Sequence, residues 1–233
     1  MILAFDTSAA HCAAALLSEE GVHARRHEEM ARGQGERLIG LLEEVLAEGG
    51  AAWSDLTRIG VGTGPGNFTG IRISVSAARG LALGLGIPAI GVTHFECVLH
   101  AARQSDERLG AGRHLVSLPY KGGLYLQPAS ASGIDGMAAM LPDAAPSTPL
   151  PRLADPGALH LLGERAGDLA RRYAQEGIPL GGHRDVTLAP DALAEAIAHV
   201  ALTRPAQSPR PTPHYIKAPD AAPSRHAAPC LLP

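Results

Sequence analysis

The sequence predicts an α/β fold in which helices cover a mixed β-sheet. Near the N-terminus, the segments "MILAF", "HCAAALLS" and "VHARRHEE" read as three short strands separated by the turn-rich joints "DTSAA" and "SEEG", which is typical of an antiparallel meander. After them, helical and strand patterns alternate up to about Gln104, as expected of parallel strands joined by helices.

The elements of the first hundred residues follow from their apolar spacing. "GERLIGLLEEVLAEGG" predicts a helix, with leucine and valine at helical intervals and Gly49 and Gly50 as its stop. "LTRIGVGTG" predicts a strand that ends in a glycine-rich loop, and a second helix follows from an N-cap at Thr69 to Leu85. "IPAIGV" and "HFECVLHAARQ" predict a further strand and helix.

Beyond Gln104 the pattern is weaker. "HLVSLPYKGGLYLQPAS" predicts a hairpin through Gly122 and Gly123, and residues 128–157 predict loops because they are rich in Pro, Ala, Ser and Asp. "ALHLLGERAGDLARRYAQEG" predicts a strand and a helix, and "APDALAEAIAHVALTRP" predicts a helix that opens at Pro190. No internal repeat is visible in the sequence.

The composition is that of an ordinary globular protein. The chain has 233 residues, 45% of them hydrophobic and 18% charged, and a formal net charge of −3. Because no basic stripe is present, we expect no extensive nucleic-acid surface of its own. Three widely spaced cysteines and an N-terminus without a basic, apolar leader predict a cytoplasmic protein with no membrane segment.

The loop "GTGPGNFTGIR" raises the question of a phosphate site. A P-loop is excluded because no lysine precedes Lys121, and the dinucleotide spacing of glycines is absent. Two interpretations remain open. The loop binds an anion through the free amides of the following helix, or Gly64, Gly66 and Gly70 serve only a tight turn and close packing.

The second predicted helix carries three distinct stripes. One is apolar and includes Ile71, Val75 and Ala78, and one is made of very small residues, Ser76, Gly80 and Gly84. Arg72 and Arg79 share a third face. Glycine inside a helix costs up to about 1 kcal/mol relative to alanine, so two glycines suggest close approach of another segment, either within the chain or from a partner.

The sequence offers no complete catalytic set. Asp6 and Thr7 end the first strand, where they suit a phosphate or metal position and equally an Asx-turn. His23 and His27 lie on a predicted strand, about 13 Å apart at 3.3 Å per residue, which is too far for one ion. His94 and His100 lie six residues apart on a predicted helix, which is again the wrong spacing for one ion. We therefore expect no metal and no catalytic residue.

Several of these motifs resemble a known family. "MILAFDTS", "GERLIGLLEEVL" and above all "GTGPGNFTGIRISVSAARGLALGLGIPAIGV" are similar to the TsaB (YeaZ) family of bacterial tRNA threonylcarbamoyladenosine biosynthesis. The resemblance covers residues 1 to about 100 and returns at "GALHLLGERA" and "PHYIKAPDA". Gln34-Gly35-Glu36 departs from the His-Ser-Glu of the family, and Leu118 and Gly123 replace two acids of the second lobe.

The resemblance implies an actin-like ATPase (ASKHA) fold in two lobes, each with a mixed sheet flanked by helices. We assign residues 1–104 to the first lobe, 105–204 to a degenerate second lobe, and 205–233 to a Pro-rich segment that packs back in part and is then disordered.

The resemblance also implies a scaffold subunit that does not catalyse by itself. Such a subunit binds and activates TsaD, joined by TsaE, for threonylcarbamoyl transfer to N6 of adenosine 37 in tRNAs that read ANN codons. tRNA is then bound through the complex, no cofactor binds to the chain alone, and ATP or ADP at the subunit interface stays open. Exposed apolar stripes would favour pairing of the free chain with itself, so homodimer and monomer both stay open.

Two sets of residues follow from the resemblance. The partner-binding candidates lie on the two helices of the first lobe and are Leu38, Leu41, Leu42, Val45, Ile71, Val75 and Ala78. The loop candidates at a nucleotide or partner junction are Asp6, Thr7, Gly64, Gly66, Thr69 and Arg72. The alternatives are a self-sufficient actin-like enzyme, either a kinase or a glycoprotease-like peptidase, and a protease or regulator of another pathway that acts by protein binding.

Overall fold

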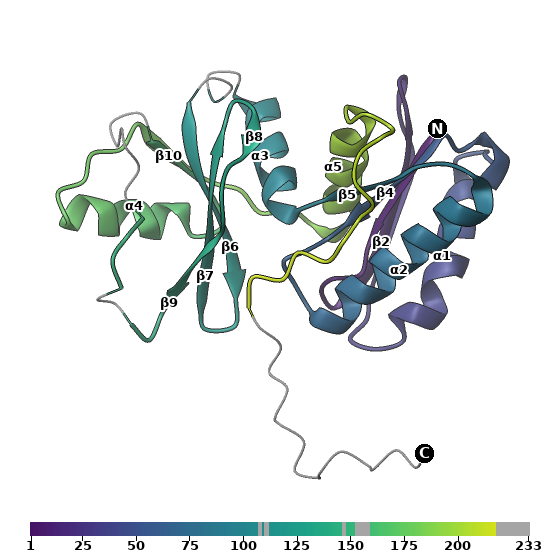
Figure 1. Cartoon of the computed structure of the whole chain (residues 1–233). Helices are drawn as coiled ribbons and strands as arrows, with labels where there is room; N and C mark the ends of the chain where they lie inside the picture. The colour runs from purple at the N-terminus through teal and green to yellow at the C-terminus, as the bar shows by residue number, and fades with distance from the viewer. Residues whose placement is uncertain (107–108, 110–111, 146–147, 152–158, 218–233) are drawn as a thin grey trace, which may run out of the picture.

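The chain forms two lobes that lie side by side (Figure 1). The structure, a computed structural model, describes residues 1–106, 109, 112–145, 148–151 and 159–217. Each lobe contains one mixed β-sheet with helices on its faces, so the predicted α/β class is confirmed. No helix within these described ranges is long and apolar enough to cross a membrane.

The sheet of the first lobe has the strand order β3-β2-β1-β4-β5. β1 pairs antiparallel with β2 and parallel with β4, and β5 continues the parallel half, so the predicted meander and βα units are confirmed. A short 3₁₀ helix, η1 (Trp53–Asp55), precedes β4. The strands are β1 (Ile2–Asp6), β2 (His11–Ser18), β3 (Gly21–Glu29), β4 (Arg58–Gly62) and β5 (Ala89–Val92).

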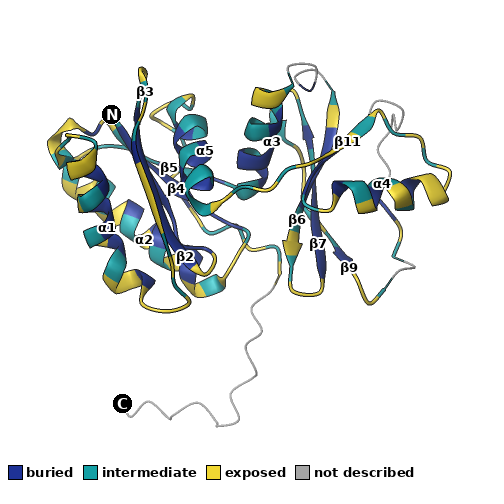
Figure 2. Ribbon diagram, turned by 180° about the vertical axis from the view of Figure 1, so that it is seen from behind, coloured by how far each residue is buried: buried dark blue, intermediate teal, exposed yellow. Residues whose placement is uncertain are grey.

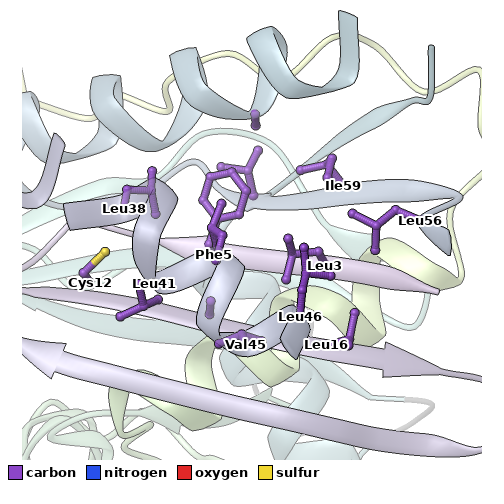
Figure 3. Packing of buried hydrophobic residues seen from close by; sticks show 14 of the residues in the cluster. Leu3, Phe5, Cys12, Leu16, Leu38, Leu41, Val45, Leu46, Leu56 and Ile59 are labelled. Carbon is purple, nitrogen blue, oxygen red and sulfur yellow. The ribbon is translucent and has the colours of Figure 1, made fainter. Parts of the chain in front are cut away.

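Both faces of this sheet are buried, which explains why β1 reads as a continuous apolar run. Leu3 and Phe5 point to the face covered by α1 (Gln34–Glu48) and α2 (Phe68–Leu85), and Figure 3 shows them beneath the leucines of α1. Ile2 and Ala4 point to the opposite face, which α5 (Pro190–Leu202) covers. The alternation of side chains along a strand thus assigns each residue to one of two cores.

The second lobe repeats the strand order of the first. Its sheet runs β11-β10-β6-β7-β8, with two antiparallel pairs on one side of β6 and two parallel pairs on the other. The predicted hairpin between β6 and β7 is confirmed. The elements are β6 (Arg113–Tyr120), β7 (Gly123–Ser130), β8 (Gly133–Ile134), β9 (Ala139–Pro142), β10 (Leu159–Gly163), α4 (Ala166–Gln175) and β11 (Gly182–Asp185).

Three strands of the second lobe differ from expectation. β8 and β9 lie in the stretch predicted as loop, and both pair antiparallel with β7. β11 pairs parallel with β10 although its sequence, Gly-His-Arg-Asp, has no strand pattern. All three strands sit at the margins of the sheet, where backbone pairing needs little apolar side-chain surface.

The lobes exchange one helix each. α3 (His94–Ser105) follows the first sheet in the chain, yet its Phe95, Val98 and Leu99 pack on the second sheet. α5 follows the second sheet and packs on the first, and the two helices contact each other between the lobes (Figure 1). The predicted division at residues 104 and 204 follows chain order, whereas packing places both helices in the other lobe.

After α5, residues 203–217 form a C-terminal strap along the first lobe. The Arg204 guanidinium donates to the Gly91 carbonyl and to Glu96, and Pro211 lies against Gly91 on the outer strand β5. Because proline lacks an N–H, this cover shields the sheet edge without adding a strand. The remainder of the predicted Pro-rich segment, residues 218–233, lies outside the described residues.

Two leucines on the helices of the first lobe provide a matched stability test. Leu42 is fully buried, whereas Leu83 is 85% exposed. We expect Leu42→Ala to lower the free energy of unfolding by about 2–5 kcal/mol because it removes packed methyl groups and leaves a cavity. Leu83→Ala should change it by less than about 0.5 kcal/mol. Urea denaturation of both variants measures this, and equal losses would contradict the two environments.

Candidate functional site

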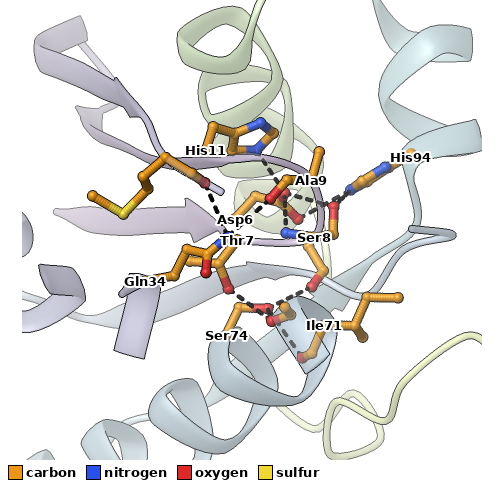
Figure 4. Close-up of polar contacts among 12 residues, drawn as sticks. Asp6, Thr7, Ser8, Ala9, His11, Gln34, Ile71, Ser74 and His94 are labelled. Atoms are coloured by element: carbon orange, nitrogen blue, oxygen red, sulfur yellow. Dashed lines mark hydrogen bonds and ion pairs between the residues drawn. The ribbon is translucent and has the colours of Figure 1, made fainter. Parts of the chain in front are cut away.

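Asp6 sits at the carboxyl end of β1 and is fully buried. Its Oδ1 lies 2.9 Å from His11 Nε2 and accepts hydrogen bonds from the Ser8 amide and the Ser8 hydroxyl, at 2.9 and 2.7 Å. Its Oδ2 lies 3.0 Å from His94 Nε2. Figure 4 shows the two imidazoles reaching the carboxylate from opposite sides. Both carboxylate oxygens are therefore engaged by the chain itself.

The surroundings of Asp6 stabilise its charged form. Burial alone raises the pKa of a carboxyl group, but the nearby charge of His94 and the hydrogen bonds from both histidines outweigh it and hold the pKa of Asp6 well below its ordinary value. Asp6 is thus an anion that its own neighbours compensate. The structure contains the Asx-turn contact, since the amide and hydroxyl of Ser8 both donate to Asp6 Oδ1. A phosphate or metal position at Asp6 stays a prediction.

The glycine-rich loop packs directly on this turn. A Cβ on Gly66 would lie 2.4 Å from the Ser8 carbonyl oxygen, and one on Gly70 would lie 1.9 Å from the Thr7 carbonyl oxygen. The Thr7 hydroxyl donates to the Gly70 carbonyl at 2.7 Å, and the Asn67 amide donates to the Ser8 carbonyl. The backbone of the loop therefore contacts the backbone of the turn at Gly66 and Gly70, and only glycine fits at these two positions.

The N-terminus of α2 is capped from within the chain. Asn67 Oδ1 accepts hydrogen bonds from the amides of Thr69 and Gly70, at 2.9 and 3.3 Å. The prediction that Thr69 is the N-cap is wrong, because the N-cap is Asn67, two residues earlier, and the helix begins at Phe68. Of the two interpretations of the loop, the packing supports the turn, since these two amides already have an acceptor.

Of the six loop candidates, Asp6, Thr7 and Gly66 lie together at the turn after β1. Their role at a nucleotide or partner junction stays a prediction. Asp6 and Thr7 are buried, and Gly64 adopts a φ of 96° with the Ile71 side chain beneath it. Arg72 points to the strap instead: its guanidinium carbon lies 3.7 Å from the Phe68 ring centroid, and its Nε donates to the Tyr215 hydroxyl at 2.9 Å.

Three contributors to this region were missed from the sequence. His11 is the second imidazole on Asp6, Asn67 caps α2, and Tyr215 of the strap stacks on Phe68 with ring centroids 4.8 Å apart. The predicted hairpin of β1 and β2 could have pointed to His11, because it is the first residue of β2 and closes the same turn. Tyr215 is far from Phe68 in the chain and gives no such signal.

The seven partner-binding candidates require a correction. All are buried in the core between the first sheet and its two helices, with exposures of 3% or less, so they cannot form a free surface in this structure. The physical reason is that each helix has one strongly apolar stripe and the sheet needs it. The corrected residues are Leu38, Leu41, Leu42, Val45, Ile71, Val75 and Ala78.

The outward face of α2 consists of its other two stripes. Ser76, Gly80 and Gly84 are exposed, and a Cβ added to either glycine would meet nothing within 4 Å. Leu83 lies among them and is 85% exposed. Figure 2 shows exposed positions along the outer sides of α1 and α2. The small residues predicted to permit close approach therefore face solvent, and no described segment of the chain covers them.

Metal ligands are not assembled within the described residues. No group of three or more His, Cys, Asp and Glu side chains among them is placed to hold an ion. His27 Nδ1 instead lies 3.8 Å from Asp191, and His23 Nε2 lies 2.7 Å from the Ser18 hydroxyl. The two strand histidines thus have separate neighbours.

Comparison with known proteins gives the family. The family model for TsaD, tRNA N6-adenosine threonylcarbamoyltransferase, matches residues 19–135, half of the chain. The tRNA threonylcarbamoyladenosine biosynthesis protein TsaB of Escherichia coli (strain K12) is 35% identical over 118 residues, 50% of this chain and 49% of that protein. The chain belongs to the TsaB (YeaZ) family of TsaD-related proteins.

Solved structures agree with the fold implied by that family. YeaZ from Pseudomonas aeruginosa superposes with a TM-score of 0.61 at 26% identity, covering 86% of this chain and 91% of that one. The ROK hexokinase from Thermus thermophilus gives 0.56 at 15% identity, covering 86% and 98%. The actin-like ATPase fold is thereby confirmed. The chain spans about half the length of the curated TsaB relatives that it matches.

The carboxylate of Asp6 supplies a pH-dependent test. A lowered pKa in the folded state contributes stability that is present above the unfolded pKa of about 3.9 and is lost as pH falls below it. Asp6→Asn should therefore destabilise the protein at about pH 5, and its deficit relative to wild type should shrink towards about pH 3. Urea denaturation across this range measures the deficit, and one that stays undiminished at low pH would refute the assignment.

Two glycines of α2 provide a second test. Gly70→Ala should lower the free energy of unfolding by about 1–3 kcal/mol, because its Cβ would overlap the Thr7 carbonyl. Gly80→Ala, in the same helix with open space around it, should raise it by up to about 1 kcal/mol. Thermal unfolding compares the two, and a stabilised Gly70→Ala variant would show that the loop does not press on the turn.

Proposed function

We propose that this chain is a binding subunit of tRNA threonylcarbamoyladenosine biosynthesis, which joins a TsaD-type subunit through the outward face of α2 and activates it. The observation that carries the proposal is the open stripe of Ser76, Gly80 and Gly84 beside the exposed Leu83. Small residues on a helix surface let a second helix approach closely, and an exposed leucine adds apolar area to that contact.

The sequence relationship supports this pathway. Relatives of this chain are named for tRNA threonylcarbamoyladenosine biosynthesis, and the matching family model is that of the transferase. This chain is related both to TsaB proteins and to TsaD. Such a relationship is expected of a subunit that pairs with a protein related to itself. The substrate, N6 of adenosine 37 in tRNAs reading ANN codons, would then be bound and modified through the complex, with TsaE as a further partner.

The occupied carboxylate of Asp6 favours this role over a self-sufficient enzyme. In the alternative, a kinase or peptidase of the same fold, this residue would have to reach a metal, nucleotide or substrate. Here His11, His94 and Ser8 engage both of its oxygens, and the loop of Gly66 and Gly70 packs on the same turn. Hydrolysis of ATP by the purified chain alone, abolished in Asp6→Asn, would favour the alternative.

A matched set of variants tests the proposed face. Gly80→Leu fills the space above the helix, and Leu83→Asp places a charge in it. Met137→Asp is the control, because Met137 is equally a large exposed hydrophobic residue, 90% exposed, but lies in the second lobe. We expect the first two to weaken co-purification of the TsaD-type subunit by about tenfold or more, and the control to leave it unchanged.

The same variants should also differ in their ability to restore tRNA modification in cells. In a strain depleted of this protein, wild type and Met137→Asp should restore the modified adenosine in total tRNA, measured by mass spectrometry of nucleosides, and Gly80→Leu should not. Since leucine is a better helix former than glycine, Gly80→Leu should still fold with an unreduced melting temperature. Full restoration by both face variants would refute α2 as the contact, and unchanged modification on depletion would refute the pathway.

A further inference from the structure

A groove lies between the C-terminal half of α2 and the C-terminal strap. It encloses about 540 Å³ and is lined on the helix side by Arg79, Gly80 and Leu83, and on the strap side by Ser208 and Arg210. Ile87, Pro88 and Ala89 line it between these two sides. We refer to it as the α2–strap groove. Its volume is in the range of pockets that take a ligand or a few side chains.

The strap wall of this groove is fixed at both ends. Arg204 is bound to Gly91 and Glu96 before the groove, and the His214 amide donates to the Thr63 carbonyl at 2.8 Å after it. Between these anchors, Pro211 is buried against Gly91. A groove with two anchored walls is formed before any partner arrives, which lowers the entropic cost of docking.

The groove carries positive charge without compensation. Neither Arg79 nor Arg210 forms an ion pair with a carboxylate of the described residues, although the chain as a whole is acidic. Arg25, Arg26 and Arg37, on the same lobe, are all paired with carboxylates. Among the residues that the structure describes, no Asp or Glu lines the groove, and α2 contains no acidic residue along its whole length.

The groove is also apolar and continuous with the outward face of α2. Leu83 borders it and projects into solvent, and Gly80 belongs both to the groove and to the open stripe. A ligand that matches these surfaces needs a negative group for the arginines and an aliphatic group for Leu83 and Ile87. A protein segment in which an acidic side chain adjoins an aliphatic one supplies both the negative and the aliphatic group, at a size that fits the groove.

We infer that the α2–strap groove docks a segment of the protein partner in which an acidic side chain adjoins an aliphatic one, and that Arg79 and Arg210 select it by charge. This inference rests on the proposed function, because it names the chemistry of the partner at the same face. Nucleic acid is less suited, since two arginines beside an acidic chain make no basic stripe. A small free anion would also meet the unfavourable carbonyl end of α2.

Charge reversal tests the inference. Arg79→Glu, Arg210→Glu and the double variant are compared with Arg184→Glu, an exposed arginine on β11 of the second lobe that lines no part of the groove. The probe is the purified TsaD-type subunit, titrated by calorimetry at about 50 and about 300 mM salt. We expect each groove variant to bind about tenfold or more weakly, the double variant to lose most of the salt dependence, and Arg184→Glu to bind like wild type.

The outcomes separate the two proposals. If wild type binds and the double variant binds equally well, the groove inference is overturned and the proposed function stands. If wild type itself fails to bind, the proposed function fails. The third outcome concerns inorganic phosphate. Suppose that wild type binds phosphate through both arginines, but that phosphate displaces the partner from wild type no better than from the double variant. The groove is then a small-anion site and the inference is overturned.

The identity of the docked segment gives an independent readout. Ser208→Cys, labelled with a photo-crosslinker, places a reactive group in the groove. After irradiation of the complex, mass spectrometry should locate the crosslink in a partner segment that has Asp or Glu next to Leu, Ile or Val. A crosslink to a segment without a carboxylate would overturn the inference even if the affinity had fallen.

Discussion

The buried carboxylate of Asp6 is the interaction on which the arrangement of this chain depends. It joins the turn after β1 to His11 of β2 and, through His94, to the first turn of α3. α3 carries the chain onto the second sheet, so one compensated charge ties the first sheet to the helix that enters the other lobe. Removing a partner of a buried charge is costly, because the charge would be left without solvent or counter-charge.

The exchange of α3 and α5 makes each lobe incomplete without the other. Each sheet buries one face beneath a helix that belongs, in chain order, to the opposite lobe, and the two helices meet between them. The strap then returns along the first lobe and covers the edge of β5. The chain thereby covers both sheets and the edge of β5 with its own helices and strap, and leaves Ser76, Gly80, Leu83 and Gly84 of α2 exposed.

This distribution of surfaces is what gives the proposed role its physical basis. The strongest apolar stripes of α1 and α2 are buried against the sheet, so the proposed partner would meet small residues, one exposed leucine and uncompensated arginines instead. Such a face gains specificity from close backbone approach and from charge more than from buried area. Asp6 lies at the end of a strand, which is a position typical of a reactive group. Its carboxylate oxygens are nevertheless bound by side chains of the same chain.

The sequence by itself determined the α/β class, the order of the elements through α3, the β6–β7 hairpin and the family, because these depend on local periodicity and on a short distinctive motif. It also identified the three stripes of α2. Only the tertiary structure decided which stripe faces the sheet. It also decided that His11 contacts Asp6, that Asn67 caps α2, and that α3 and α5 each pack on the sheet of the other lobe. The physical reason is that a stripe predicts burial without naming the surface that buries it, and contacts between residues far apart in the chain leave no periodic trace.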